Sequence, residues 1–281
     1  MTWDVDYLRD NRDENMGFLS KTLLPDGTEI PGTNFDYNYL QHRKVDVVSS
    51  ALDFILPFEK YKITAGAKVS FTNTRNGINY DTSDPTLVQD DYFRYKEQIY
   101  ALYADYSREY SERFSMQLGL RMEHTRTTGI SEAKDTEDKH DYTRLFPTVY
   151  LLYSPTDGHA LNFSFSNRIS RPSQNMVNPF PFYQNKYTYA CGREDLKPSY
   201  TYNVELGYTL KNNFNVSAYY SYSDDVFFQV VDLDAETNVT SFLWENFMQT
   251  HAFGLNNSYT FRTKWLQAYA QHGVSYRRTT S

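Results

Sequence analysis

Histidines next to carboxylates are the side chains of this sequence whose types and spacing suit acid–base chemistry. His124 follows Glu123, and His140 precedes Asp141. A histidine held by a carboxylate is a common general base in hydrolases. The sequence has no G-x-S-x-G elbow, no H-E-x-x-H pair and no phosphate-binding glycine loop to accompany them. We therefore predict no catalytic residues and interpret both pairs as solvated positions at the rim of one loop.

Alternating oxygen ligands are the second candidate for chemistry. Asp232, Asp234, Glu236 and Asn238 are spaced like the ligands of a calcium loop, whose oxygens must converge on one cation. Thr237 stands where such a loop needs glycine for its sharp turn. The tip of a β-hairpin is often acidic as well. We predict no metal site and no cofactor.

Composition narrows the classes of protein that remain. The chain has 281 residues and a formal charge of −7, which argues against a nucleic-acid partner. Its 26 Tyr and 19 Phe are typical of a β-rich chain. The longest apolar run, 51–58, is far shorter than the roughly 18 residues of a membrane-spanning helix. The acidic first 25 residues lack the apolar core of a signal peptide, and Cys191 alone allows no intramolecular disulfide.

Period-two alternation is the main structural signal and predicts an all-β fold. In 114–123, for example, Leu118 and Leu120 fall on one face, whereas Gln117 and Arg121 fall on the other. The pattern is cleanest in five segments: 61–72, 114–123, 161–168, 202–211 and 214–223. Weaker strands are predicted at 2–10, 43–58, 94–109, 142–154, 238–262 and 264–277. Together they give eleven antiparallel strands.

The connections between these strands alternate between short and long. Short turns are predicted at 59–60, 111–112, 154–159, 212–213 and 262–264, with Asn212-Asn213 suited to positive φ. Long polar connections are predicted at 11–42, 74–93, 126–141, 171–198 and 225–237. Long loops at one end and short turns at the other are typical of a transmembrane β-barrel.

Side-chain placement fits the two faces and two rims of such a barrel. Aromatic residues gather near the strand ends, as in the girdles of membrane barrels: Phe58, Tyr61, Phe114, Tyr153, Tyr208, Phe214, Phe261 and Trp265 beside the short turns, and Phe71, Tyr202, Tyr222 and Tyr276 toward the other ends. Charged residues on the polar parity suit a water-filled lumen: Lys62, Lys68, Arg121, Glu123, Arg168, Glu205 and Lys211. A soluble β-sandwich would also expose these charges to water, so the loop pattern carries the distinction.

Several sequence runs resemble a known family. RISRPS at 168–173, NPFPFYQNKY at 178–187 and GREDLKPSYTYNVELGY at 192–208 are similar to the carboxyl-terminal barrel portion of Bacteroidetes-type outer-membrane β-barrel proteins, of the TonB-dependent receptor family. The resemblance extends over about 98–276. Its motif residues here are Arg168, Arg171, Pro172, Gly192, Leu196 and Pro198. Arg193 and Glu194 depart from it, because the family usually has Asn and Pro at these two positions.

The resemblance implies a location, a function and partners. It implies an outer-membrane location in a Gram-negative bacterium and uptake of a solute such as a siderophore, glycan or peptide. Expected partners are outer-membrane lipid, a small-molecule or glycan ligand, and the TonB energy-coupling system acting through a plug domain that this sequence lacks. Residues 1–281 are then one partial barrel domain, without plug or signal peptide, from a barrel of about 22 strands.

The connection 171–198 is the best candidate for contact with a ligand. It is long and rich in aromatic rings that stack on flat ligands or sugars, namely Phe180, Phe182, Tyr183, Tyr187 and Tyr189. A loop that folds onto its own aromatic residues is an equally good interpretation. Two other classes of protein remain open: a self-standing outer-membrane enzyme of the protease or lipase type, and a soluble carbohydrate-binding β module.

Overall fold

The computed structural model describes residues 1–82 and 90–281 and is almost entirely β-structure. Eleven strands follow one another along the wall of the sheet, as predicted: β1 (Thr2–Ser20), β2 (Phe35–Pro57), β3 (Tyr61–Thr82), β4 (Asp91–Ser111), β5 (Phe114–Ser131), β6 (Thr136–Tyr153), β7 (His159–Ser170), β10 (Ser199–Leu210), β11 (Phe214–Asp234), β12 (Val239–Arg262) and β13 (Gln267–Thr280). Three short elements were not predicted: α1 (Gln174–Val177), β8 (Phe182–Asn185) and β9 (Thr188–Cys191). Among the described residues, no helix has the length and apolar character needed to cross a membrane.

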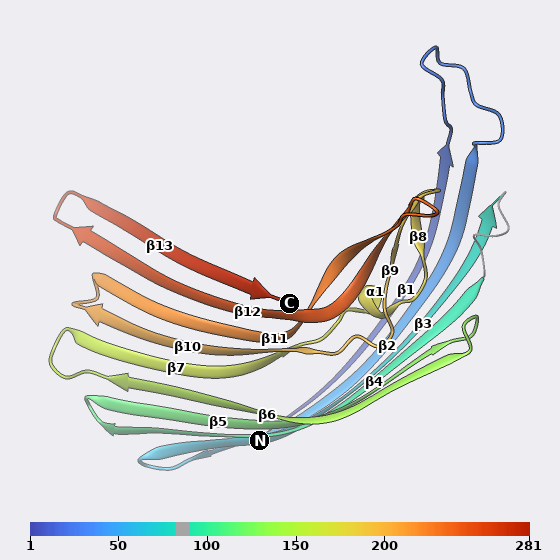
Figure 1. Ribbon diagram of the computed structural model, residues 1–281. Coiled ribbons are helices and arrows are strands. Elements are labelled where there is room, and N and C mark those ends of the chain that lie inside the picture. The colour runs from blue at the N-terminus through green and yellow to red at the C-terminus, as the bar shows by residue number, and fades with distance from the viewer. Residues whose placement is uncertain (83–89) are drawn as a thin grey trace.

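The wall strands pair antiparallel in chain order and form one strongly curved sheet (Figure 1). The connections predicted as short turns lie at one end of the sheet, and the other connections between the described wall strands lie at the opposite end (Figure 1). In the described part of the chain, no strand pairs with the outer edge of β1 or of β13. The sheet is therefore a trough with two open edges, and α1, β8 and β9 lie inside its curve.

Strand register separates two faces, as the alternation predicted. Leu118 of β5 stands opposite Tyr106 and Val149, on the convex face. Its neighbour Gln117 stands opposite Ser107 and Tyr150, on the concave face. The predicted lumenal charges follow the concave parity in register, except Lys211, which lies in a turn. The apolar parity thus forms the outer surface of the wall.

Glycines on the concave face make room for side chains of neighbouring strands. The ring of Tyr103 lies over Gly66, where a Cβ atom would clash with it. Tyr103 Oη, from β4, reaches across β3 and donates a hydrogen bond of 2.5 Å to Asp53 Oδ1 of β2. Tyr219 lies over Gly254 in the same way. Glycine at these two positions therefore lets the tyrosine rings lie against the inner wall.

Most of the predicted long connections are continuations of strands. Only 21–34, 132–135 and 235–238 separate the strands within 11–42, 126–141 and 225–237. Part of 74–93 lies outside the described residues. These predictions were wrong because β2, for example, has 23 residues, whereas a spanning strand needs about 9–11. Beyond the membrane the outer face is solvated, so the apolar alternation ends while the strand continues.

One short turn is displaced by a residue from its prediction. Positive φ occurs at Lys211 (49°) and Asn212 (57°), not at Asn212 and Asn213. The backbone N–H of Lys211 donates to the carbonyl of Gly158 in the neighbouring turn, at 2.5 Å. This contact joins two turns at the same end of the sheet.

The ladder between β6 and β7 is much shorter than its neighbours. It joins Thr148–Tyr153 of β6 to Leu161–Ser166 of β7 and stops there. The next residue of β6 is Pro147, which has no N–H to donate. Farther from the short turns β6 and β7 separate, and the chain leaves the wall after Ser170.

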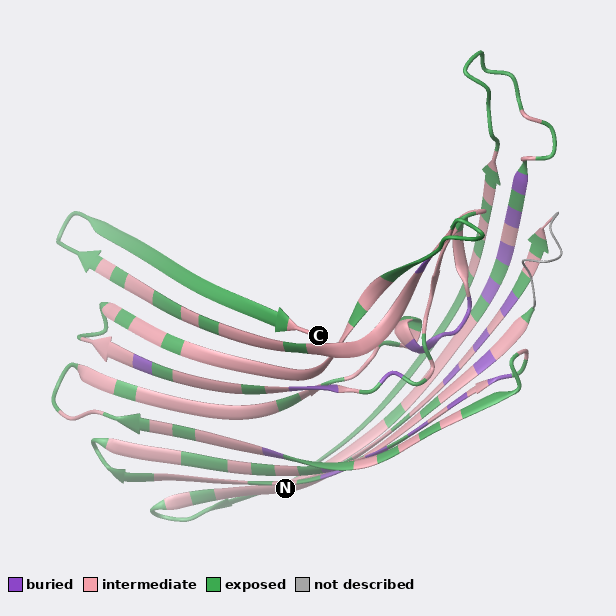
Figure 2. Ribbon diagram, viewed as in Figure 1, coloured by how far each residue is buried: buried purple, intermediate pink, exposed green. Residues whose placement is uncertain are grey.

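The hydrophobic core lies between the wall and the segment that leaves it (Figure 2). Buried residues of the wall strands face buried residues of 171–198. The cluster consists of Phe35, Tyr37, Tyr39, Ile78 and Phe93 from β2, β3 and β4, with Val177, Phe180 and Leu196 opposite them. The concave face is therefore apolar at this end, although it is polar near the short turns.

Candidate functional site

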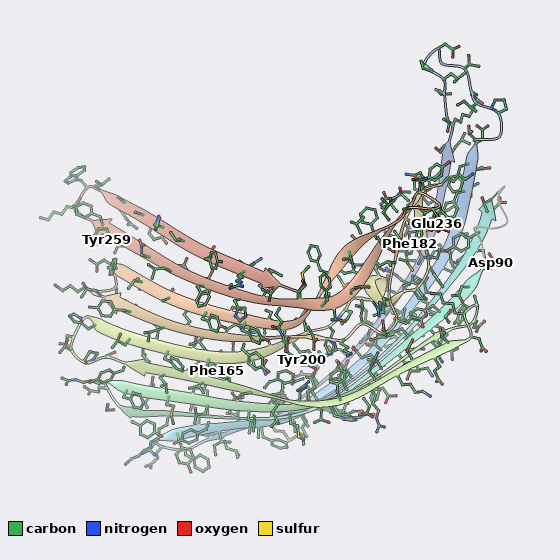
Figure 3. All side chains as sticks on the ribbon, viewed as in Figure 1. Asp90, Phe165, Phe182, Tyr200, Glu236 and Tyr259 are labelled. Atoms are coloured by element: carbon green, nitrogen blue, oxygen red, sulfur yellow. The ribbon has the colours of Figure 1, made fainter. Side chains whose placement is uncertain are left out.

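The connection between β7 and β10 folds into the trough and is the candidate site. We call residues 171–198 the insert. It passes through α1, forms the β8–β9 hairpin and returns to the wall at Ser199, with Phe182 projecting within the curve of the sheet (Figure 3). The structure therefore places the predicted ligand loop inside the barrel wall rather than above it.

One side of the insert is anchored on β2, β3 and β4. Tyr37 Oη and Tyr80 Oη both donate to the carbonyl oxygen of Pro181, at 3.3 and 3.2 Å. The ring of Phe180 is 1% exposed and meets Phe93 edge-on, with ring centroids 6.4 Å apart. Polar and apolar contacts hold this side together, so the insert is part of the packed structure.

The other side of the insert is anchored on β12. Strand β9 pairs in parallel with Thr240–Leu243, which is the only parallel ladder among the described strands. Arg193 Nη1 donates to Glu245 Oε1 at 3.0 Å. Asn246 accepts from the N–H of Lys197 at 2.8 Å and donates to its carbonyl at 2.9 Å. The insert consequently bridges two parts of the wall that are far apart along the sheet.

Arg171 begins the insert and forms an ion cluster with the wall. Its guanidinium bonds to Glu123, which is 5% exposed, and donates to Thr125 Oγ1 at 3.2 Å. Glu97 lies 3.7 Å from Arg171 Nε, and Arg121 Nη2 donates to Glu123 Oε2 at 2.6 Å. Two arginines and two carboxylates therefore compensate one another on the inner wall, and Arg171 fixes where the chain leaves it.

The other motif residues shape the insert or flank it. Gly192 donates its N–H to the carbonyl of Asn178 at 2.9 Å, and a Cβ there would clash with the Asn178 backbone. Leu196 is buried in the core. Pro172 and Pro198 are half-buried near the two ends of the insert, and Arg168 is exposed on β7. These positions fix the course of the insert and bring no reactive groups together.

The five predicted ligand-contact residues differ in accessibility. Phe180 is buried, Phe182, Tyr183 and Tyr189 are half-buried, and Tyr187 is 54% exposed at the hairpin turn. Tyr183 meets the ring of Tyr37 edge-on at 5.0 Å between centroids and lies 5.4 Å from Tyr189. Phe180 is therefore a packing residue, whereas Tyr187 is open to solvent.

A polar cavity beside the insert was not predicted. It has a volume of about 330 Å³ and lies between β1, β2 and the insert. Its polar lining includes Arg12, Glu14, Gln41 and Arg43, with Tyr39 and Phe182 as aromatic walls. Residues 11–42 were predicted to be a loop, so the two faces of this segment were not predicted. Charges at every second position, as in Arg12 and Glu14, are the signal that could have revealed them.

Burial changes the acid–base properties of two groups in the insert. It raises the pKa of the Cys191 thiol, whose Sγ donates to the carbonyl of Pro179 at 3.0 Å. It also raises the pKa of the Glu194 carboxyl, although the hydrogen bond from Thr136 opposes the shift. A raised thiol pKa disfavours the reactive thiolate, so Cys191 behaves as a packing residue.

The adjacent histidine–carboxylate pairs of the sequence do not meet. Glu123 lies on the concave parity and His124 on the convex one, and His140 and Asp141 are divided in the same way. On the convex face His124 contacts Asp141 across the ladder, at 3.6 Å between Nε2 and Oδ1. Neither pair forms the general base of a hydrolase as it stands in the sequence.

The acidic residues near 234 stabilise a turn. Asp234 accepts hydrogen bonds from the N–H of Glu236 at 2.9 Å and from the hydroxyl of Thr237 at 2.7 Å. Asn238 follows with a φ of 57°. Among the residues that the structure describes, no group of His, Cys, Asp and Glu is arranged to hold a metal ion.

The fold and the site together define a class of protein. A curved antiparallel sheet with an apolar outer face, a polar inner face and an inward-folded insert is the wall of a membrane β-barrel. The chain belongs to the outer membrane protein beta-barrel family, whose family model matches residues 1–281. The predicted outer-membrane location and barrel fold are thus confirmed, and the soluble β module is excluded. No curated protein matches the sequence of this chain.

Solved structures share the fold. The ferric yersiniabactin uptake receptor FyuA from Yersinia pestis matches 99% of this chain and 40% of its own length, with 16% identity and a TM-score of 0.56. The copper transporter OprC matches 96% of this chain and 46% of its own length, with 12% identity and a TM-score of 0.61. The unliganded ferric citrate transporter FecA matches 98% and 40%, with 11% identity and a TM-score of 0.54. The chain therefore spans less than half the length of these receptors and transporters.

Proposed function

We propose that this chain is part of the barrel wall of a TonB-dependent outer-membrane receptor that takes up a solute. The observation that carries the proposal is the insert, which crosses the lumen between β2–β4 and β12 and presents aromatic rings there. The fold shared with uptake receptors and a copper transporter supports it. On this proposal the chain is a receptor component and not an enzyme, and TonB acts through a plug domain outside residues 1–281.

Labelled solutes test the uptake proposal. Cells with and without the intact protein would be given labelled ferric siderophores, oligosaccharides and peptides, and accumulation would be measured with TonB present and absent. We expect one solute class to accumulate only when both proteins are present. Equal accumulation of every solute in all strains would refute uptake, and hydrolysis of phospholipid or peptide by the purified protein would favour the enzyme.

We further propose that residues 1–281 form one domain within a larger barrel of about 22 strands. The open edges of β1 and β13 support this, because each unpaired backbone group in lipid costs several kcal/mol. The isolated chain should aggregate or need detergent and should give no discrete conductance in planar bilayers. A folded, cooperative monomer in plain buffer would contradict the proposal.

Within the insert, we propose that Tyr183, Tyr187 and Tyr189 stack on the ligand, with Phe182 and Phe180 supporting them from behind. Stacked rings contribute roughly 0.5–1.5 kcal/mol beyond the area they bury. The double substitution of Tyr187 and Tyr189 by Ala should therefore weaken binding of the transported solute by about tenfold. Tyr153→Ala is the matched control, because Tyr153 is exposed beside a short turn at the other end of the sheet.

A further inference from the structure

Three basic residues stand side by side on the convex face of the wall. Strand register places Lys44 of β2 directly opposite Arg75 of β3, and Arg75 directly opposite Arg94 of β4. We call Lys44, Arg75 and Arg94 the basic row. Directly opposed residues of an antiparallel pair have Cβ atoms roughly 4.5–5.5 Å apart, so like charges there repel each other. Such an arrangement is unfavourable unless an anion lies against it.

The basic row lies just beyond the apolar band of the outer surface. Val48 pairs with Phe71 on the same face. This pair lies four residues closer to the short turns than the pair of Lys44 and Arg75. Phe71 and Tyr100 meet edge-on with ring centroids 5.8 Å apart, at the rim of the band. Four residues span roughly 13 Å of strand. This distance moves the charges from the edge of the hydrocarbon into the headgroup region, where an Arg facing lipid costs only about 0–1 kcal/mol.

Among the described carboxylates, Asp46 attracts Lys44 without forming an ion pair with it, and no carboxylate pairs with Arg75 or Arg94. No ion pair joins Lys44, Arg75 or Arg94 to a carboxylate in the part of the chain that the structure describes. Asp46, the nearest acid on the same face of β2, already holds Arg9 at 2.6 Å. Arg75 Nε and Arg94 Nε are shielded from solvent and have no hydrogen-bond partner among the described residues. The basic row therefore carries positive charge and N–H donors that the described residues leave unpaired.

We propose that the basic row binds the phosphorylated headgroup of a glycolipid in the outer leaflet of the membrane. Guanidinium groups bind phosphate with paired hydrogen bonds, and three adjacent cations suit a headgroup that carries more than one phosphate. Lys96 follows two residues after Arg94 on the same face and extends the positive surface toward the band. The acyl chains of the same lipid would lie on the apolar band below, so one molecule satisfies both surfaces.

Lipid retention tests the proposal on the intact protein in detergent. The probe is diphosphorylated lipid A, compared with its dephosphorylated form and with phosphatidylglycerol, and bound lipid is measured by native mass spectrometry. Each cation near an anionic lipid surface contributes about fivefold in affinity, so Arg75→Gln with Arg94→Gln should weaken retention about 25-fold. Retention by the unchanged protein should also fall steeply with salt.

A matched variant separates this site from general charge loss. Lys62→Gln with Lys68→Gln also removes two positive charges, from the same strand as Arg75 but on the concave face, and should retain lipid A as the unchanged protein does. Unchanged retention in the double variant would overturn the proposal. Equal binding of the dephosphorylated lipid, or of phosphatidylglycerol, would overturn it too. The double variant should fold, because it removes charges that repel each other. Arg75→Lys with Arg94→Lys keeps both charges and should bind part of the lipid that the glutamine variant loses.

Discussion

The wall near the short turns and the wall near the insert use the same alternation for opposite purposes. In β3 near the short turn, Ile63 and Val69 face outward and Lys68 faces inward. Farther along the same strand, Arg75 faces outward and Ile78 inward. The register does not slip between the two regions, because β2 and β3 pair without interruption.

What changes between the two regions is the medium on each side. Near the short turns the outside is hydrocarbon and the inside is a polar lumen. Near the insert the outside is headgroup and water, and the inside is the buried cluster against the insert. A strand keeps its geometry through this exchange, so its residue pattern must invert while its backbone does not. Substitutions can therefore break this arrangement on one side at a time.

The largest effect is expected in the core of the insert. Phe180→Ala removes a ring that is 1% exposed and should destabilise the docked insert by about 3–5 kcal/mol. Tryptic cleavage after Lys186, in the turn between β8 and β9, should then accelerate more than a hundredfold. Tyr187→Ala, which changes an exposed ring, should alter cleavage little. Equal cleavage in both variants would mean that the insert is not docked by this core.

The second-largest effect is expected from charges placed on the outer face near the short turns. Leu118→Arg and Val204→Arg put a cation into hydrocarbon, at a cost of about 2–4 kcal/mol each, and should impair assembly in the outer membrane. Gln117→Arg and Asn203→Arg point into the lumen and should be tolerated. Heat-modifiable mobility of the intact protein measures assembly. Equal damage from both pairs would remove the assignment of the two faces.

The ion cluster at the start of the insert should have a smaller effect. Arg171→Ala leaves the buried Glu123 with Arg121 alone and should cost about 1–3 kcal/mol of insert stability. Adding Glu123→Gln to Arg171→Ala should recover part of this loss, because the uncompensated carboxylate is gone. Arg168→Ala, at an exposed position, is the control. Protease protection of the insert measures its stability. If the effects of Arg171→Ala and Glu123→Gln simply added in the double variant, the two residues would not be coupled.

The smallest effect on stability is expected from epitope tags, which test which end of the sheet faces the cell exterior. An epitope within 132–135, at the hairpin between β5 and β6, should be reachable on intact cells. An epitope at Asn212-Asn213 should be hidden until the outer membrane is opened. Antibody labelling of intact and lysed cells distinguishes the two. Labelling of the second tag on intact cells would invert the topology.

Sequence patterns predicted the wall near the short turns and failed near the insert for one physical reason. The alternation in 114–123 reflects hydrocarbon on one face of the strand and a polar lumen on the other. It therefore does not depend on contacts with residues that are distant in the sequence. Burial of Tyr37 depends on Pro181, 144 positions away, and no local pattern carries that distance. Strands β8 and β9 have four residues each, too few for alternation to stand out.

The candidate site was predicted only in part, by resemblance rather than by periodicity. Arg171 and Gly192 are motif residues, and the structure gives both a role in fixing the insert. The aromatic residues 180–189 were recognised as a group, but their division into buried and exposed rings depends on the wall they meet. The basic row was not predicted, because its members are thirty-one and nineteen positions apart in sequence and become neighbours only through strand register.

The pairing of β9 with β12 constrains the order in which this protein can fold. Strand β9 precedes β10 and β11 along the chain, yet its ladder partner is reached only after both have been completed. Hairpins of the wall join neighbouring segments and close short loops, whereas this ladder closes a loop of about fifty residues and loses more entropy. The wall strands should therefore assemble as successive hairpins first, and the lumen should close last, when the insert locks onto a wall that already exists.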